Sequence, residues 1–215
     1  MRRIILVASG ACLGLVGALA LTPGDIPQGA IDASVVRSGA TFERAWRLPV
    51  AARFPREIAW QSNLSRCGPA SLANVFRSLG EGAASEGSVL AGTGRCRTGF
   101  CIAGLTLDEL ADLARTHAGR RVTVLRDLGP EAFQAHLRRA NDPDRRYIVN
   151  FSRRPIFGSG AGHHSPIGGY LEEEDLVLVL DTNRAVRPWL IERGRLFSAM
   201  DTLDGGRKRG LLLIE

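Results

Sequence analysis

The sequence has almost no lysine and few aromatic residues. Of its 28 Lys and Arg residues only Lys208 is a lysine, and aromatic residues make up 6% of the 215-residue chain. The net charge is +6, but the arginines are interspersed with acidic residues instead of forming a basic run. Nucleic-acid-binding surfaces usually combine a basic stripe with aromatic side chains. The sequence therefore predicts no nucleic-acid partner, only a solvated basic surface.

Long apolar runs are also lacking, except at the N-terminus. Arg2 and Arg3 precede IILVASGACLGLVGALAL, and no further charge follows until residue 25. A positive segment followed by an apolar one, with a small-residue cleavage site at 18–20, is typical of a signal peptide. Because the run is slightly short for a membrane span, residues 1–21 are predicted to be a signal peptide or an uncleaved signal anchor. Both predict an exported protein, periplasmic or anchored in the inner membrane facing the periplasm.

Cysteine is scarce, with four residues in the chain. Cys12 lies in the N-terminal segment. Cys96 and Cys101 enclose the short segment RTGF, and in an oxidising compartment they could pair as a small-loop disulfide. A structural zinc site needs further Cys or His residues at ligand spacing, and none lies nearby, so no metal site is predicted. This leaves Cys67 as the thiol whose role has to be explained.

Repeats and low-complexity tracts are absent, and helical patterns precede strands along the chain. Residues 22–45 show little periodicity and are predicted to be a linker or an arm lying on the domain. Residues 46–215 are predicted to form one catalytic domain. Helices are expected within residues 67–80, 106–119, 129–140 and 190–203, and strands within 145–153, 163–171, 175–183 and 210–215. Helices followed by an antiparallel sheet indicate an α+β fold.

Polar residues at the ends of these elements form a candidate catalytic set. Cys67 begins a helix, where the dipole and free N–H groups favour a thiolate. The segment GHHSPIGGY places histidine on one strand, and Asp181 ends the next strand, where it can orient that ring. The side-chain amide of Gln61, together with the Cys67 N–H, would form an oxyanion hole. The order Gln, Cys, His, acid is the papain-like arrangement, although the same roles recur on other folds.

Three segments of the chain resemble the catalytic domain of the phytochelatin synthase family. They are QSNLSRCGPASLANVF, GHHSPIGGYLEEEDLVLVLDTNR and AMDTLDGGRKRGLLLI, within residues 46–215. The resemblance implies a papain-like cysteine proteinase fold, with an N-terminal helical part packed on a C-terminal antiparallel sheet. It also implies an enzyme that takes glutathione, releases glycine and holds γ-glutamylcysteine as a thioester. Plant members pass this unit to another glutathione or a growing phytochelatin, whereas short bacterial members mostly hydrolyse it.

The resemblance assigns a Cys-His-Asp triad to particular positions. Cys67 matches the nucleophile, Gln61 the oxyanion glutamine and Asp181 the orienting acid. The family reads Gly-His-aromatic-Ser-Pro, so His163 matches the catalytic histidine and His164 replaces the aromatic residue. Adjacent side chains on a strand point to opposite faces, so only one of the two histidines is expected to face Cys67. We expect it to be His163.

The resemblance also implies substrate contacts. Arg184 matches an arginine linked to substrate binding and is expected to pair with a glutathione carboxylate, with Arg153 as a second candidate. No cofactor is required, but a heavy-metal ion such as cadmium or zinc is expected either as an activator or within a glutathione complex. Membrane contact is expected only if residues 1–21 stay uncleaved, and a homodimer is left open.

Two other functions stay open on the residues alone. A papain-like peptidase acting on peptides would use the same nucleophile, as bacteriocin-processing enzymes with a similar Gln…Cys-Gly start do. In a non-catalytic thiol or metal-binding module, Cys67 would act without a histidine base and an orienting acid. Turnover of glutathione separates the three possibilities.

Overall fold

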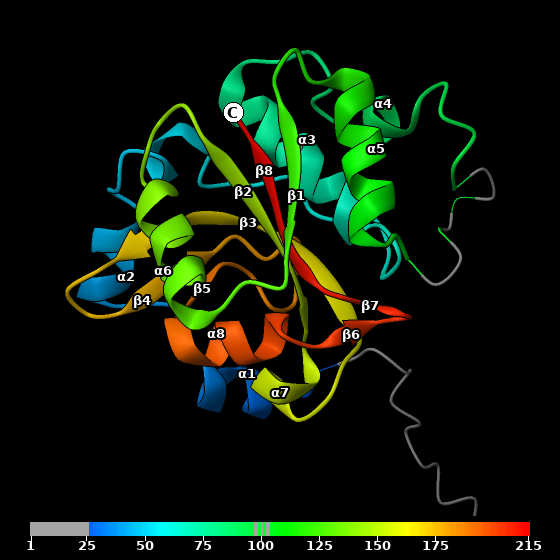
Figure 1. The fold of residues 1–215 in the computed structure, drawn as a ribbon. Coiled ribbons are helices and arrows are strands. Elements are labelled where there is room, and N and C mark those ends of the chain that lie inside the picture. The colour runs from blue at the N-terminus through cyan, green and yellow to red at the C-terminus, as the bar shows by residue number, and fades with distance from the viewer. Residues whose placement is uncertain (1–25, 97–98, 100, 102–103) are drawn as a thin grey trace, which may run out of the picture.

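A six-stranded antiparallel sheet forms the centre of the computed structural model, which describes residues 26–96, 99, 101 and 104–215 (Figure 1). The strand order is β1-β8-β2-β3-β4-β5. These strands are β1 (Val122–Arg126), β2 (Arg146–Ser152), β3 (Gly162–Leu171), β4 (Leu176–Val179), β5 (Trp189–Glu192) and β8 (Gly210–Ile214). A separate hairpin consists of β6 (Leu203–Asp204) and β7 (Arg207–Lys208). The predicted signal segment, residues 1–21, lies outside the described residues.

Helices cover both faces of this sheet. They are α1 (Gln28–Ser34), α2 (Ala40–Ala45), α3 (Cys67–Leu79), α4 (Glu86–Leu90), α5 (Leu107–His117), α6 (Pro130–Arg139), α7 (Arg154–Phe157) and α8 (Arg193–Met200), with a 3-10 turn at Ala51–Arg53. In Figure 1, α3, α4 and α5 gather beside β1 and β8, while α1, α7 and α8 lie together below the sheet. The chain is therefore layered as helix, sheet and helix, an α+β arrangement.

The sheet divides the apolar core into two clusters. Successive residues of β2 point to opposite faces, so Ile148 packs with the α3 and α5 side, whereas Tyr147 and Val149 pack with α6 and α8. Helix α3 is the most enclosed helix, with 11 of its 13 residues buried. Burial on this scale fixes the N-terminus of α3 against β3 and holds its first residue inside the molecule.

Residues 28–45, predicted as part of a linker or arm, are integrated into the domain. Ile31 of α1 is fully buried in one apolar cluster, and Phe42 of α2 is buried in the other. Val36, between the two helices, forms an antiparallel bridge to Leu190 of β5. The segment is thus an arm packed on the domain and not a free linker. Two helices of seven and six residues are too short to show a clear apolar period in sequence.

The helix predicted over residues 190–203 is wrong at its start and its end. Trp189–Glu192 forms the edge strand β5, and the helix runs only over Arg193–Met200. The run Trp-Leu-Ile is buried as a strand because β4 offers it an open sheet edge. Strand β1 and the β6–β7 hairpin were not predicted. Across the described residues, the structure has no helix of the length and apolarity that a membrane crossing requires.

Candidate active site

Cys67 is the first residue of α3 and is 5% exposed. No side chain caps this helix, so the N–H groups of Cys67 and Gly68 remain available near the thiol, whereas Pro69 has no N–H and the Ala70 N–H donates to Arg66 O at 3.0 Å. Burial raises the pKa of the Cys67 thiol, but the charge of His163 and hydrogen bonds from His163 and His164 outweigh it and lower the pKa well below its usual value. These surroundings favour the thiolate form of Cys67.

His163 and Asp181 form a buried pair behind the thiol. The His163 Nε2 atom lies 3.1 Å from Asp181 Oδ1, and both side chains are at most 3% exposed. This is an ion-pair distance, although the ring N–H is not well aligned on the carboxylate. Burial and the Arg153 charge lower the pKa of His163, but the negative charges of Asp181 and Cys67 overcome both and raise it. A lowered pKa for Cys67 and a raised pKa for His163 are the directions that a thiolate–imidazolium pair would give.

Asp181 is fixed by several donors as well as by His163. The Arg153 Nη2 atom donates to both carboxylate oxygens at 2.6 Å, the Asn183 N–H donates at 2.9 Å and the Trp189 indole N–H at 3.3 Å. Burial raises the pKa of Asp181, but Arg153 and His163 lower it far below its usual range. These donors favour the ionised form of the carboxylate. The sequence predicts Arg153 as a second substrate-binding arginine, but its side chain is buried and contacts Asp181 instead.

His164 also reaches the thiol, from the other face of β3. Its Nδ1 atom lies 3.8 Å from Cys67 Sγ, and the residue is 3% exposed. His163 instead faces Phe151, with ring centroids 5.6 Å apart, on the side of Asp181. The hydrogen-bond contact to Cys67 Sγ thus comes from His164, whereas the sequence predicts that His163 faces the thiol. The role of His163 as the catalytic histidine stays a prediction. The sulfur lies at the start of α3, beside the N-terminal end of β3 that carries both histidines.

Gln61 lies in the segment that leads into α3 and is tied to the loop after Asp181. Its backbone N–H donates to Thr182 O at 2.9 Å, and the Thr182 hydroxyl donates to its Oε1 at 3.0 Å. Its Nε2 donates one N–H to Asn63 O at 2.9 Å, which leaves the second N–H unused. That N–H as an oxyanion donor stays a prediction.

A cavity of about 270 Å³ opens beside the thiol. Its lining includes Cys67, His164, Asp204 and Arg209. Arg209 lies 3.2 Å from Asp204, donates to Asn150 Oδ1 at 2.7 Å, and has its Nε atom buried without a partner. The cavity therefore combines a nucleophile with one cation and one anion.

Asp204 and Arg209 were not recognised from the sequence. They flank the β6–β7 hairpin, whose acidic and basic residues are also typical of a solvated turn. Gly162 is a local sign of the Arg209 position, since a Cβ at residue 162 would lie 2.4 Å from Arg209 Nη1. The glycine before the two histidines leaves the space that the guanidinium occupies.

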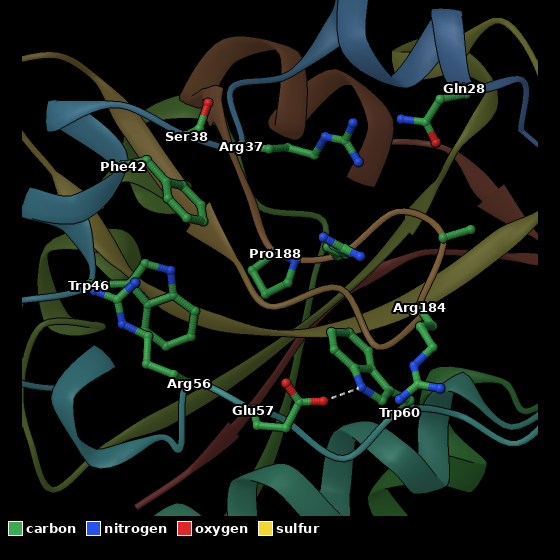
Figure 2. A pocket seen from close by; sticks show the side chains of 12 residues that line it. Gln28, Arg37, Ser38, Phe42, Trp46, Arg56, Glu57, Trp60, Arg184 and Pro188 are labelled. Carbon is green, nitrogen blue, oxygen red and sulfur yellow. Dashed lines mark hydrogen bonds between the residues drawn. The ribbon is translucent and has the colours of Figure 1, made fainter.

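Arg184 lies in a different cavity from Cys67. This larger hollow, about 1040 Å³, is also lined by Arg37, Trp46 and Trp60 (Figure 2). Figure 2 shows Arg184 on the same side of the hollow as Trp60, whose indole N–H donates to a neighbouring glutamate at 2.8 Å. Arg184 as a ligand of a glutathione carboxylate stays a prediction.

Cys96 and Cys101 are joined in a disulfide, the pairing predicted from the sequence. The Cys101 N–H donates to Ser65 Oγ at 3.0 Å, which anchors the loop to the segment before Cys67. Within the described ranges, no group of three or more His, Cys, Asp or Glu side chains is arranged to hold a metal ion.

Sequence comparison identifies the family. The sequence model of the phytochelatin synthase family matches residues 95–211, more than half of the chain. The chain belongs to the phytochelatin synthase family. The match contains His163, Asp181, Asp204 and Arg209, but Cys67 precedes it. The place of Cys67 in the site therefore rests on the contacts described above.

Curated relatives of this phytochelatin synthase family member are named glutathione gamma-glutamylcysteinyltransferase. The wheat (Triticum aestivum) protein is 38% identical over 52% of this chain and 23% of its own length. The Schizosaccharomyces pombe protein is 27% identical over 52% of this chain and 28% of its own length. The match thus spans about a quarter of these relatives.

The fold is that of papain-like cysteine peptidases. The peptidase domain of Streptococcus ComA superposes with a TM-score of 0.51 at 17% identity, covering 74% of this chain and 96% of that domain. At this identity the likeness shows the fold alone. It agrees with the fold that the sequence resemblance implies.

Proposed function

We propose that this protein is a glutathione γ-glutamylcysteinyltransferase-like enzyme. In this proposal Cys67 attacks glutathione, glycine leaves, and the γ-glutamylcysteinyl thioester passes to water or to a second glutathione. The observation that carries the proposal is the buried Cys67 thiol at the start of α3, close to the His163–Asp181 pair and lining a cavity with Asp204 and Arg209. The names of the curated relatives support the substrate class.

Acylation begins with the Cys67 thiolate. Its Sγ attacks the carbonyl carbon of the Cys-Gly peptide bond, and the π electrons move to the carbonyl oxygen. The Cys67 N–H and the unused Gln61 side-chain N–H stabilise this oxyanion. When the intermediate collapses, the C–N bond breaks and His163 gives its proton to the glycine nitrogen, while Asp181 keeps the ring oriented. The products are free glycine and a thioester on Cys67.

Asp204 and Arg209 suit the γ-glutamyl end of glutathione. That end carries an α-ammonium and an α-carboxylate, the charges complementary to a neighbouring Asp and Arg. A guanidinium can bind the carboxylate through two parallel hydrogen bonds, and Arg209 lines the cavity beside Cys67. We assign these two residues to the γ-glutamyl head.

Deacylation reverses the proton flow. After glycine leaves, His163 is neutral and takes a proton from water, whose oxygen attacks the thioester carbon. The C–S bond then breaks and the electron pair returns to Sγ. The amino group of a second glutathione can replace water, and the product is then a longer γ-Glu-Cys chain.

The test is incubation of the purified protein with glutathione, with and without cadmium, followed by mass spectrometry. We expect glycine, γ-Glu-Cys and a covalent γ-glutamylcysteinyl adduct on Cys67, all absent from Cys67→Ser. Longer chains that appear with cadmium would indicate transfer and metal stimulation. Cleavage of peptides without glycine release from glutathione would indicate a peptidase instead. No turnover together with a Cys67 inert to iodoacetamide would indicate a binding module.

We further propose that the protein works outside the cytoplasm. The Cys96–Cys101 disulfide supports this, because such bonds persist mainly in oxidising compartments. Cell fractionation and N-terminal mass analysis of the mature protein test it. Recovery of the intact chain in the cytoplasm with both thiols reduced would contradict the proposal.

A further inference from the structure

The His164 ring is fixed against the start of α3. Its Nδ1 atom lies 3.8 Å from Cys67 Sγ, within reach of an N–H···S hydrogen bond. The ring passes over Gly68, where an added Cβ would lie 3.8 Å from the same Nδ1 atom. The Ser71 hydroxyl donates to His164 O at 2.9 Å and ties the strand to the helix. The backbone therefore presents Nδ1 to the sulfur.

The other ring nitrogen determines which form of His164 fits. The Nε2 atom is buried and has no hydrogen-bond partner. A proton on Nε2 would be an unpaired buried donor, which is unfavourable, and it would turn the lone pair of Nδ1 toward an anionic sulfur. A doubly protonated ring would leave the same N–H unpaired. A proton on Nδ1 alone pairs with the sulfur and leaves only a lone pair unpaired.

Charged groups around the sulfur come from several elements. His163 lies on β3, with Asp181 and Arg153 behind it. Arg209, at the start of β8, lines the same cavity as Cys67, and its positive charge interacts with the thiolate. Asp204 pairs with Arg209 and offsets part of that charge. His164 differs from these residues because it can donate a hydrogen bond to sulfur without carrying a charge.

We propose that His164 donates its Nδ1–H to Cys67 Sγ as a second catalytic donor beside His163. In the free enzyme the bond holds the thiolate. During deacylation, which rests on the proposed function, it stabilises the sulfur as the C–S bond breaks and the electron pair returns to it. His163 has by then taken the proton of the attacking water, so two donors share the leaving thiolate. The bond thereby favours rapid release of the acyl group.

The first test needs no glutathione. The rate of Cys67 alkylation by iodoacetamide is measured against pH for the full chain, for His164→Phe and for His164→Asn. In His164→Asn, the amide nitrogen can replace Nδ1. We expect the alkylation midpoint of His164→Phe to rise by about one pH unit, the size expected for a lost hydrogen bond to a charged group. We expect His164→Asn to stay near the wild-type profile.

A matched control is His136→Phe on α6, which makes the same substitution away from the thiol and should leave the profile unchanged. An unchanged midpoint in His164→Phe, or equal shifts in His164→Phe and His164→Asn, would overturn the proposal. Should His164→Phe fail to fold, ¹⁵N NMR of the wild-type imidazoles decides directly. The expected signal is a neutral His164 ring protonated on Nδ1, and protonation on Nε2 would overturn the hydrogen bond.

The second test follows the acyl-enzyme by intact-protein mass spectrometry after mixing with glutathione. We expect decay of the adduct to slow about tenfold in His164→Phe while its formation changes less, and His164→Asn to restore most of the decay rate. Equal decay rates in wild type and His164→Phe would overturn the deacylation role. If no adduct forms in any variant, the proposed function fails, whereas the alkylation profile still decides the His164–Cys67 bond.

Discussion

His163 and His164 are adjacent and both buried, yet their surroundings differ. His163 has a carboxylate behind it, with Nε2 at 3.1 Å from Asp181. His164 has nothing behind it, because its Nε2 atom is buried without a partner. A ring whose second nitrogen faces an anion can accept and carry a positive charge. A ring without such a partner is limited to donating one hydrogen bond.

This difference shows that the group behind a catalytic ring sets its role. Both imidazoles act on the Cys67 thiol: His164 Nδ1 lies 3.8 Å from Sγ, and the charge of His163 lowers the pKa of the thiol. The distinction arises on the far side of the sheet, where Arg153 fixes Asp181. The following substitutions test each part of this contrast.

The largest effect is expected from removing the base. His163→Ala should reduce thioester formation about 10³-fold, because a positioned general acid–base contributes about 10²–10⁴-fold. His164→Ala should keep most of the acylation rate. Single-turnover assays that follow glycine release measure both. If His164→Ala lost acylation and His163→Ala kept it, the two roles would be reversed.

Removal of Arg153, which pairs with Asp181 behind His163, should lower the stability of the fold. Arg153→Met leaves the Asp181 carboxylate buried without its main cation and should destabilise the fold by about 3–5 kcal/mol. Urea unfolding followed by circular dichroism measures the loss. Arg154→Met is the matched control, since its side chain is exposed and lacks this pairing, and it should change stability little. Equal losses in the two variants would argue against the buried pair.

A smaller effect is expected on the pH profile. In the folded enzyme the Asp181 charge raises the pKa of His163, so the proton is present at low pH and lost as pH rises through that pKa. Asp181→Asn removes the negative charge and leaves Arg153 to lower the pKa of His163. The alkaline limb of acylation should therefore move to lower pH, which glycine release across a pH series would detect. A limb that stays in place or moves to higher pH would show that Asp181 does not control the ring.

The smallest effect is expected in the large arginine- and tryptophan-lined hollow of Figure 2. Arg184 lines this hollow and not the cavity with Cys67. Arg184→Ala should change the rate of glycine release less than about threefold, the range of an exposed charge contact. Arg209→Ala, inside the small cavity, should raise the KM for glutathione much more. A large increase in the KM for glutathione in Arg184→Ala would instead show that Arg184 binds the first glutathione.

Much of the site follows from short motifs. Local patterns place Cys67 at the start of a helix. Together with family-specific sequence motifs, they also place His163 and Asp181 on neighbouring strands. Arg153 was recognised as a functional arginine, but its partner could not be predicted. Its contact with Asp181 joins residues 28 positions apart through β2 and the loop after β4. Local spacing does not encode such a contact.

The sequence by itself determined the family and the α+β class and singled out Cys67 as the candidate nucleophile, because helix starts, strand alternation and sequence motifs are local properties. Only the tertiary structure showed that His164 reaches Cys67, that Asp204 and Arg209 share its cavity, and that Arg184 lies elsewhere. Side chains meet there because α3 is buried against β3 and the β6–β7 hairpin folds over the strand end. These approaches depend on how layers pack, which a one-dimensional pattern does not specify.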